Sequence, residues 1–148
     1  MSFAPSQKLT VPIAILRVCI GIIYLWFGML KFFPGISPAE DLAKETIQLL
    51  TFGLIPPHLS LVLLALWETI IGLLLISGLF KRASMALVGL HMICTFTPLV
   101  LLPHLSFTRQ PYALTLVGQY IVKNIVIVSA LLVIHTYQRA IVSVTQRP

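Results

Sequence analysis

Long apolar runs recur along this chain, and they limit the folds that it can adopt. Runs of about 18 or more residues alternate with short polar segments, and each is long enough to cross about 30 Å of hydrocarbon as a helix. Hydrophobic residues make up 58% of the 148 residues and charged residues only 9%, against about 25% charged in soluble domains. The sequence therefore predicts an integral membrane protein, organised as one domain over residues 1–148.

Four of the apolar runs predict membrane-spanning helices. Their expected ranges are 11–33, 59–80, 83–102 and 112–137. Only Lys81 and Arg82 separate the second range from the third, so these two helices must form an antiparallel hairpin. Pro98 is expected to kink the third helix, because proline has no N–H to donate and clashes with the preceding turn. The predicted fold class is an all-α membrane protein, an antiparallel four-helix transmembrane bundle.

The loop after the first span carries a different pattern. Ser37, Pro38 and Glu40 form a capping-box signature with proline at the first helical position. Apolar residues then recur with a period of 3.6 residues, and charged and amide side chains occupy the other face. The sequence predicts one short interfacial helix over about 38–51, which lies at the membrane surface or caps the bundle.

The distribution of basic residues predicts the orientation in the membrane. One side of the predicted bundle carries Lys8, Lys81, Arg82, Arg139 and Arg147, and the other carries Lys31, Lys44 and Arg109. Because cytoplasmic loops carry the excess of Lys and Arg, both termini are expected to be cytoplasmic. The net charge of +6 comes from scattered residues rather than a patch, so the expected partner is the lipid bilayer and not nucleic acid.

Each predicted span contains one Lys, Arg, His or Glu residue away from its ends, at a cost of about 2.5–3.5 kcal/mol near the helix centre. These residues are Arg17, Glu68, His91 and Lys123. Counted along the helices, Glu68 and Lys123 both lie near the bilayer midplane, so an ion pair between them is expected. Arg17, from the inner leaflet, is the other expected partner of Glu68. For His91 we favour a hydrogen bond between helices over a ligand role.

Other polar and small residues share faces with these charges. The first span carries a stripe with spacings of four, three, four and three residues: Arg17, Gly21, Tyr24, Gly28 and Lys31. Its glycines allow a neighbouring helix to approach closely, and Lys31 at its outer end can reach the membrane surface. The candidate site is an intramembrane polar cluster whose members are Arg17, Tyr24, Lys31, Glu68, His91, Gln119, Lys123 and Asn124.

No metal or nucleotide site is predicted. His91 and His135 differ by about 10 Å in depth, which argues against a bis-histidine haem. His58 and His104 have no carboxylates beside them, so a zinc site has little support. The two cysteines lie inside apolar runs and do not form a C-x-x-C motif. The sequence also contains no Gly-rich phosphate loop and no nucleophile elbow.

Four segments resemble the DoxX-like family of small four-helix membrane proteins. They are LRVCIGIIYLWFGMLKF (16–32), WETIIGLLLISG (67–78), TFTPLVLL (95–102) and GQYIVKNIVIVSALLVI (118–134). The resemblance covers nearly the whole chain. By position, Arg17, Lys31, Glu68 and Lys123 match the polar pattern of the family.

The resemblance also implies a functional setting. Some members are described as the small membrane subunit of a thiosulfate:quinone oxidoreductase, and others as membrane partners of oxidative-stress enzymes. It implies an accessory subunit of a quinone-linked redox or oxidative-stress system in the bacterial plasma (inner) membrane, not catalytic on its own. The implied cofactor is a quinone, and the implied partner is a redox enzyme subunit or a second copy of the chain.

Three alternatives stay open at this point. The chain could be a small quinone-reactive oxidoreductase subunit, or a scaffold or assembly factor for other membrane proteins. The polar cluster could also serve only to fix helix register, because lipid provides no hydrophobic force between helices.

Overall fold

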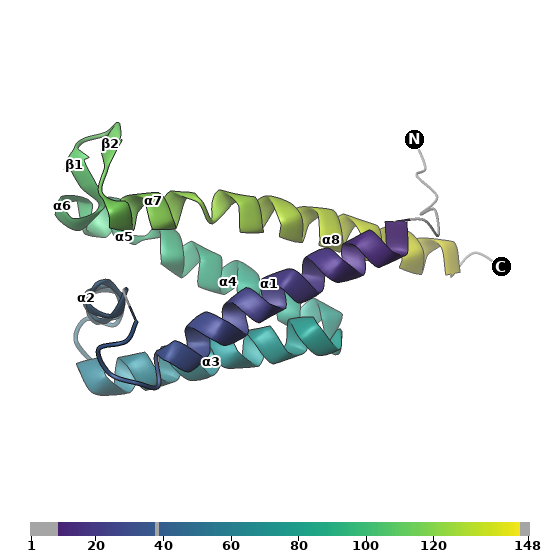
Figure 1. The fold of residues 1–148 in the computed structure, drawn as a ribbon, viewed down its shortest axis with the longest axis horizontal. Coiled ribbons are helices and arrows are strands. Elements are labelled where there is room, and N and C mark those ends of the chain that lie inside the picture. The colour runs from purple at the N-terminus through teal and green to yellow at the C-terminus, as the bar shows by residue number, and fades with distance from the viewer. Residues whose placement is uncertain (1–8, 38, 146–148) are drawn as a thin grey trace.

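The computed structural model is mostly helical and describes residues 9–37 and 39–145 (Figure 1). Four helical segments within this part of the chain are long and apolar enough to cross a membrane. They are Thr10–Leu30, Pro57–Ser77, Lys81–Leu101 and Leu116–Ile141. The predicted fold class, four apolar membrane helices with one additional short helix, is confirmed.

Two of the four crossings are interrupted. The first and second are continuous helices, α1 (Thr10–Leu30) and α3 (Pro57–Ser77). The third consists of α4 (Lys81–Phe96) and α5 (Pro98–Leu101), so the helix breaks at Pro98, as predicted. The fourth consists of α7 (Leu116–Val122) and α8 (Ile125–Thr145).

Close contact between α1 and α3 fixes their relative position. A Cβ atom built on Gly72 would lie 2.6 Å from the backbone nitrogen of Leu25, and one on Gly28 would lie 2.8 Å from that of Thr69. These distances leave no room for a side chain, so the glycines bring the two backbones into contact. The glycine stripe of α1 therefore faces α3 and carries its polar neighbours to the same interface.

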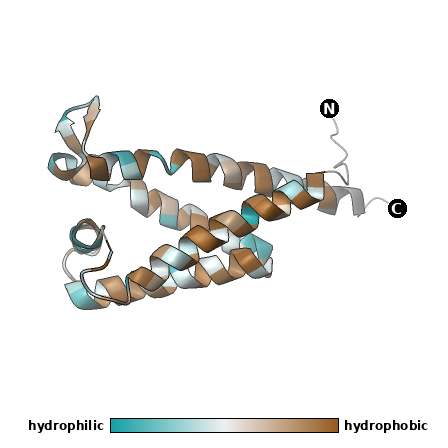
Figure 2. Cartoon of the chain, in the orientation of Figure 1, coloured by the Kyte–Doolittle hydropathy of each residue, from teal (hydrophilic) through white to brown (hydrophobic). Residues whose placement is uncertain are grey.

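The bundle encloses a small core and exposes large apolar side chains outward. Most of the buried apolar residues form one cluster, made of Ile20, Tyr24, Ile71, Leu75, Val88, Met92, Leu131 and Ile134. Outside it, residues such as Trp26 (67% exposed) and Val100 (79% exposed) face away from the protein. Figure 2 shows apolar residues along all the long helices, with fewer polar residues among them. A lipid environment accounts for this distribution.

The short helix α2 (Glu40–Leu50) is seen nearly end-on in Figure 1, across the direction of the long helices. The predicted capping box is wrong. Ala39 is the N-cap residue and makes no side-chain capping bond. Glu40 instead accepts a hydrogen bond from the Gly35 N–H at 2.7 Å and pairs with Lys44 at 2.6 Å. Pro38 lies outside the described residues.

A small β-hairpin connects the third crossing to the fourth. After α6 (Pro103–Ser106), strands β1 (Phe107–Arg109) and β2 (Ala113–Leu114) pair antiparallel. Thr115 then caps α7, since its Oγ1 accepts the Gly118 N–H at 3.1 Å and donates to the Leu105 carbonyl at 2.7 Å. The fourth crossing thus begins four residues later than the expected start at 112.

Candidate functional site

Glu68 is the centre of a polar network inside the bundle. Its Oε2 lies 2.6 Å from Lys31 Nζ, and its Oε1 lies 3.1 Å from His91 Nε2. Glu68 is only 7% exposed and Lys31 9%, so the ion pair is formed away from solvent. Each carboxylate oxygen therefore has its own partner, on a different helix in each case.

The network continues from His91 to α1. The Nδ1 atom of His91 lies 3.1 Å from the Tyr24 hydroxyl and 3.3 Å from Thr95 Oγ1. The Thr95 hydroxyl also donates to the His91 carbonyl at 2.8 Å. When Nε2 donates its proton to Glu68, Nδ1 of the neutral ring is left to accept one from Tyr24. Lys31, Glu68, His91 and Tyr24 thus form a continuous chain of protonatable groups, which we call the polar quartet.

An unsatisfied hydrogen-bond donor lies beside the polar quartet. The ring of Trp67 meets the His91 ring edge-on, with centroids 5.7 Å apart and an interplanar angle of 84°. Its Nε1 atom is buried and has no hydrogen-bond partner within the described residues, and neither has Thr69 Oγ1. An unpaired buried donor costs about 1–3 kcal/mol, so this N–H is a place where a ligand acceptor would be stabilising.

The polar quartet forms because three helices bring its members to one depth. α3 ends at Ser77 and α4 begins at Lys81, so Glu68 and His91 lie about 14 and 15 Å from the hairpin at about 1.5 Å per residue. On α1, Gly28 packs against Glu68 and Thr69. Lys31 lies one turn further on and its side chain reaches back to Glu68, in the direction that helical side chains favour.

The expected pairing of Glu68 with Lys123 or Arg17 is wrong. Glu68 is paired with Lys31 and His91 instead. The expected relative depths of these residues were wrong because the C-terminal end of α3 lies level with Arg17, and α1 extends beyond it. This offset places Lys31 within reach of Glu68, whereas it was expected to extend towards the membrane surface.

Arg17 stabilises the end of α3. Its Nη1 donates to the carbonyl oxygen of Leu75, and to that of Ile76 at 3.3 Å. Gly78 packs closely against the Arg17 guanidinium, since a Cβ atom built on this glycine would lie 2.9 Å from it. The last carbonyls of a helix have no partner within it and carry partial negative charge. Arg17 therefore acts as a C-terminal cap, apart from the polar quartet.

The polar residues of the fourth crossing do not join the polar quartet either. Gln119 and Lys123 are exposed, and Asn124 is half-buried. The Lys123 ammonium lies 4.0 Å from the centre of the Tyr120 ring, a cation–π contact. The helix is interrupted at Lys123 and Asn124, between α7 and α8. Of the eight predicted cluster residues, the structure brings four together and places the other four elsewhere.

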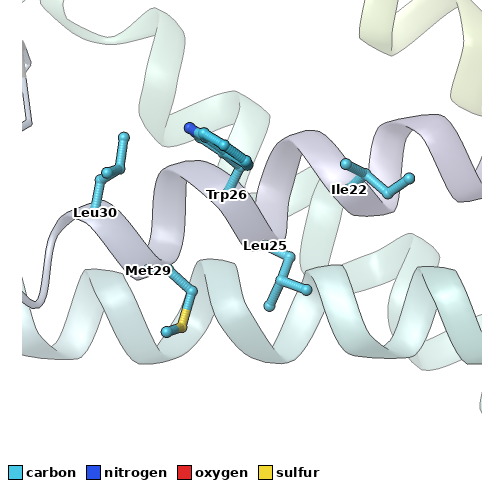
Figure 3. A pocket seen from close by; sticks show the side chains of 5 residues that line it. All are labelled: Ile22, Leu25, Trp26, Met29 and Leu30. Carbon is cyan, nitrogen blue, oxygen red and sulfur yellow. The ribbon is translucent and has the colours of Figure 1, made fainter.

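Two further features bear on ligands. Within the described residues, no group of three or more His, Cys, Asp or Glu residues could hold a metal ion. A hollow of about 380 Å³ lies on α1 and is lined only by Ile22, Leu25, Trp26, Met29 and Leu30. Figure 3 shows that all five side chains come from this one helix. The hollow has no polar lining and lies apart from the polar quartet.

The fold and this interior define an integral membrane protein with a bundle of four crossings around a buried polar network. The sequence matches the family model DoxX over residues 13–102, and the chain belongs to the DoxX family. The matched region contains the whole polar quartet and ends before α7. Comparison with curated proteins and with solved structures gave no match.

Proposed function

We propose that this DoxX-family protein is an accessory subunit of a quinone-linked redox or oxidative-stress system in the bacterial plasma membrane. In this proposal, the polar quartet and Trp67 bind a quinone headgroup. The observation that carries it is the buried, unpaired N–H of Trp67 next to a chain of protonatable side chains. A quinone headgroup presents carbonyl oxygens, which accept hydrogen bonds and take up protons when the ring is reduced.

Each member of the site has a distinct role in this proposal. Trp67 donates its free N–H to one quinone carbonyl. His91 and Tyr24 exchange protons with the headgroup, and Glu68 stabilises the positive charge of His91 when the ring is protonated. Lys31 keeps Glu68 ionised by pairing with its other oxygen. Reduction of one quinone takes two electrons and two protons: a partner redox subunit supplies the electrons, and this network carries the protons.

The exposed polar residues of the fourth crossing support an accessory role. Lys123 lies about 8 Å from the midpoint of the span Leu116–Ile141 at about 1.5 Å per residue, within the hydrocarbon. Exposure of an ammonium group to lipid there is costly, and Gln119 is exposed one turn away. A partner subunit that covers this face would remove that cost. A photo-cross-linking residue at Gln119 should then give a discrete product in cells, whereas one at Ile22, on the apolar face of α1, should give none.

A binding experiment with matched tryptophan variants tests the headgroup site. The wild type, Trp67→Phe and Trp26→Phe are each placed in lipid nanodiscs as the full chain and mixed with a labelled short-tail quinone. A filter that holds back the nanodiscs then separates bound from free quinone. Loss of one hydrogen bond of about 1 kcal/mol should weaken binding about fivefold in Trp67→Phe. Trp26 is exposed on the outer face of α1, so its variant should bind like the wild type. A wild type that retains no quinone, or equal binding by all three, would refute the proposal.

The alternatives give different results in simple assays. A purely structural quartet predicts that Glu68→Gln alters stability but leaves the cellular response to quinones unchanged. An oxidoreductase that acts alone predicts quinone reduction by the purified chain with a soluble electron donor. A scaffold predicts a stoichiometric membrane partner whose amount falls when this chain is deleted, with no dependence on Glu68.

A further inference from the structure

An apolar groove with one basic end runs between α4 and α8. It has a volume of about 550 Å³ and lies outside the polar quartet. Its apolar lining includes Met85, Gly89, Met92, Phe96, Val128 and Leu131. A Cβ atom built on Gly89 would meet nothing within 4 Å, so the missing side chain of this glycine leaves the groove open. Pockets of this size with mostly apolar walls and a few polar groups are typical of ligand sites.

The polar lining residues lie at one end of the groove. Arg82 belongs to the first turn of α4 and His135 lies opposite on α8. Arg139 is exposed one turn beyond His135 on the same face of α8. Phe96, also in the lining, is fourteen residues from Arg82, or about 21 Å along the helix. The groove therefore extends from a basic mouth, near the start of α4 and the C-terminal half of α8, into the hydrocarbon.

We propose that this groove is a binding site for an anionic phospholipid. One acyl chain lies along the apolar lining, and the phosphate is bound by Arg82, His135 and Arg139. A headgroup with a net negative charge complements this mouth, because each basic residue near an anionic lipid surface contributes a favourable electrostatic interaction. The four acidic residues of the chain all lie elsewhere, three in α2 and one in the polar quartet. A zwitterionic headgroup would find no carboxylate there for its ammonium group.

Native mass spectrometry of the delipidated full chain tests this site. The protein in mild detergent receives equal amounts of phosphatidylglycerol and phosphatidylcholine with identical acyl chains. The wild type should retain phosphatidylglycerol in preference. Arg82→Gln should lower its retention about fivefold, the effect of one basic residue at an anionic headgroup, and Arg109→Gln, at the opposite end of the bundle, should leave it unchanged.

A second pair of variants tests the groove itself. Gly89→Leu fills the groove and should abolish retention of the lipid, whereas Gly89→Ala leaves most of the space and should not. Thermal unfolding of each variant verifies that it is folded, and the Gly89 pair decides the outcome if Arg82→Gln fails to fold. Equal retention of the two lipids by the wild type, or full retention of phosphatidylglycerol by folded Gly89→Leu, would overturn the proposal. So would displacement of the lipid by a neutral quinone that binds more tightly in the same groove.

Discussion

Glu68 remains inside the bundle because both of its oxygens are bound. Lys31 supplies the opposite charge at 2.6 Å, and His91 supplies a second hydrogen bond at 3.1 Å. A carboxylate without such partners in a medium of low dielectric constant would be protonated or would destabilise the fold. Residues from α1 and α4 thus compensate a charge that α3 could not carry alone.

Replacement of Lys31 should show that the stability of the bundle depends on the ion pair between Lys31 and Glu68. Lys31→Met leaves the buried carboxylate without its cation, so the free energy of unfolding should fall by about 3 kcal/mol. The double variant Lys31→Met/Glu68→Gln should recover most of this loss, because no charge is left unpaired. Titration with sodium dodecyl sulfate in mixed micelles measures both values. Lys44→Met, in the half-exposed pair on α2, should change little, and an equal loss in the single and double Lys31 variants would disprove the pairing.

A second carboxylate, outside the membrane-spanning segments, should respond to pH. The hydrogen bond from Lys44, together with that from the Gly35 N–H, lowers the pKa of Glu40 below its ordinary value. The stabilisation is then complete above the ordinary glutamate pKa of about 4.3 and is lost as the pH falls through the lowered pKa. The NMR shift of the Gly35 amide should report this step. The step should disappear in Glu40→Gln, and a step at or above the ordinary pKa would contradict the contact.

At the scale of helices, the sequence predicted which helices form better than where they end and how far each is shifted along its neighbour. Run length and hydropathy predicted four crossings, the spacing of glycines predicted a close face on α1, and Pro98 predicted a break. The depths were wrong because helix ends depend on local geometry. Gly78 has a φ of +72° and ends α3 three residues before the expected Phe80, while α4 begins two residues before the expected 83. These shifts bring Glu68 and His91 level.

The fourth crossing shows a second limit of prediction from sequence. Lys123 and Gln119 follow a helical spacing, and that spacing indicates a shared face but not the direction in which it points. The structure exposes both residues. The direction depends on contacts between distant elements, since α7 packs mainly on α6 and the inner faces of α1 and α3 are already occupied by each other. A single sequence contains no direct signal of these contacts.

Two glycine-to-alanine variants test the close pairing of α1 and α3. In Gly72→Ala the new methyl group would lie 2.6 Å from a backbone nitrogen of α1, so the helices must separate, at a cost of about 1–3 kcal/mol. In Gly89→Ala the methyl group enters open space, so stability should be unchanged or raised by up to about 1 kcal/mol. Unfolding in mixed micelles compares the two. Equal effects would contradict the backbone contact.

At the scale of the whole molecule, the two ends of the bundle differ in charge and in the elements that they carry. The start of α1 and the end of α8 lie at one end of the bundle, with the hairpin between α3 and α4 (Figure 1). The described basic residues at that end include Lys81, Arg82 and Arg139, and the four carboxylates of the described residues lie in α2 and the polar quartet. The opposite end carries α2, with its three acidic residues, and the β-hairpin. When Lys8 and Arg147 are added from the sequence, Lys and Arg number five on this side against three on the other, so we expect this end to be cytoplasmic.

Labelling of single cysteines tests this orientation. In a background without Cys19 and Cys94, Thr108→Cys lies in β1 and Phe80→Cys lies at the hairpin between α3 and α4, and both positions are exposed. A membrane-impermeant maleimide added to spheroplasts should label Thr108→Cys only, because Phe80 is expected on the cytoplasmic side. Phe80→Cys should react once the membrane is opened. The reverse pattern would invert the orientation.

The most direct measurement for the proposed role of the polar quartet is redox difference infrared spectroscopy. The full chain with a bound short-tail quinone is reduced and reoxidised at an electrode. If the network exchanges protons with the headgroup, the charge of His91 changes beside Glu68, so the difference spectrum should contain a shifted carboxylate band. This band should disappear in Glu68→Gln and persist in Glu45→Gln, a change in the exposed helix α2. A wild-type spectrum that contains the quinone bands but overlays that of Glu68→Gln would contradict this role.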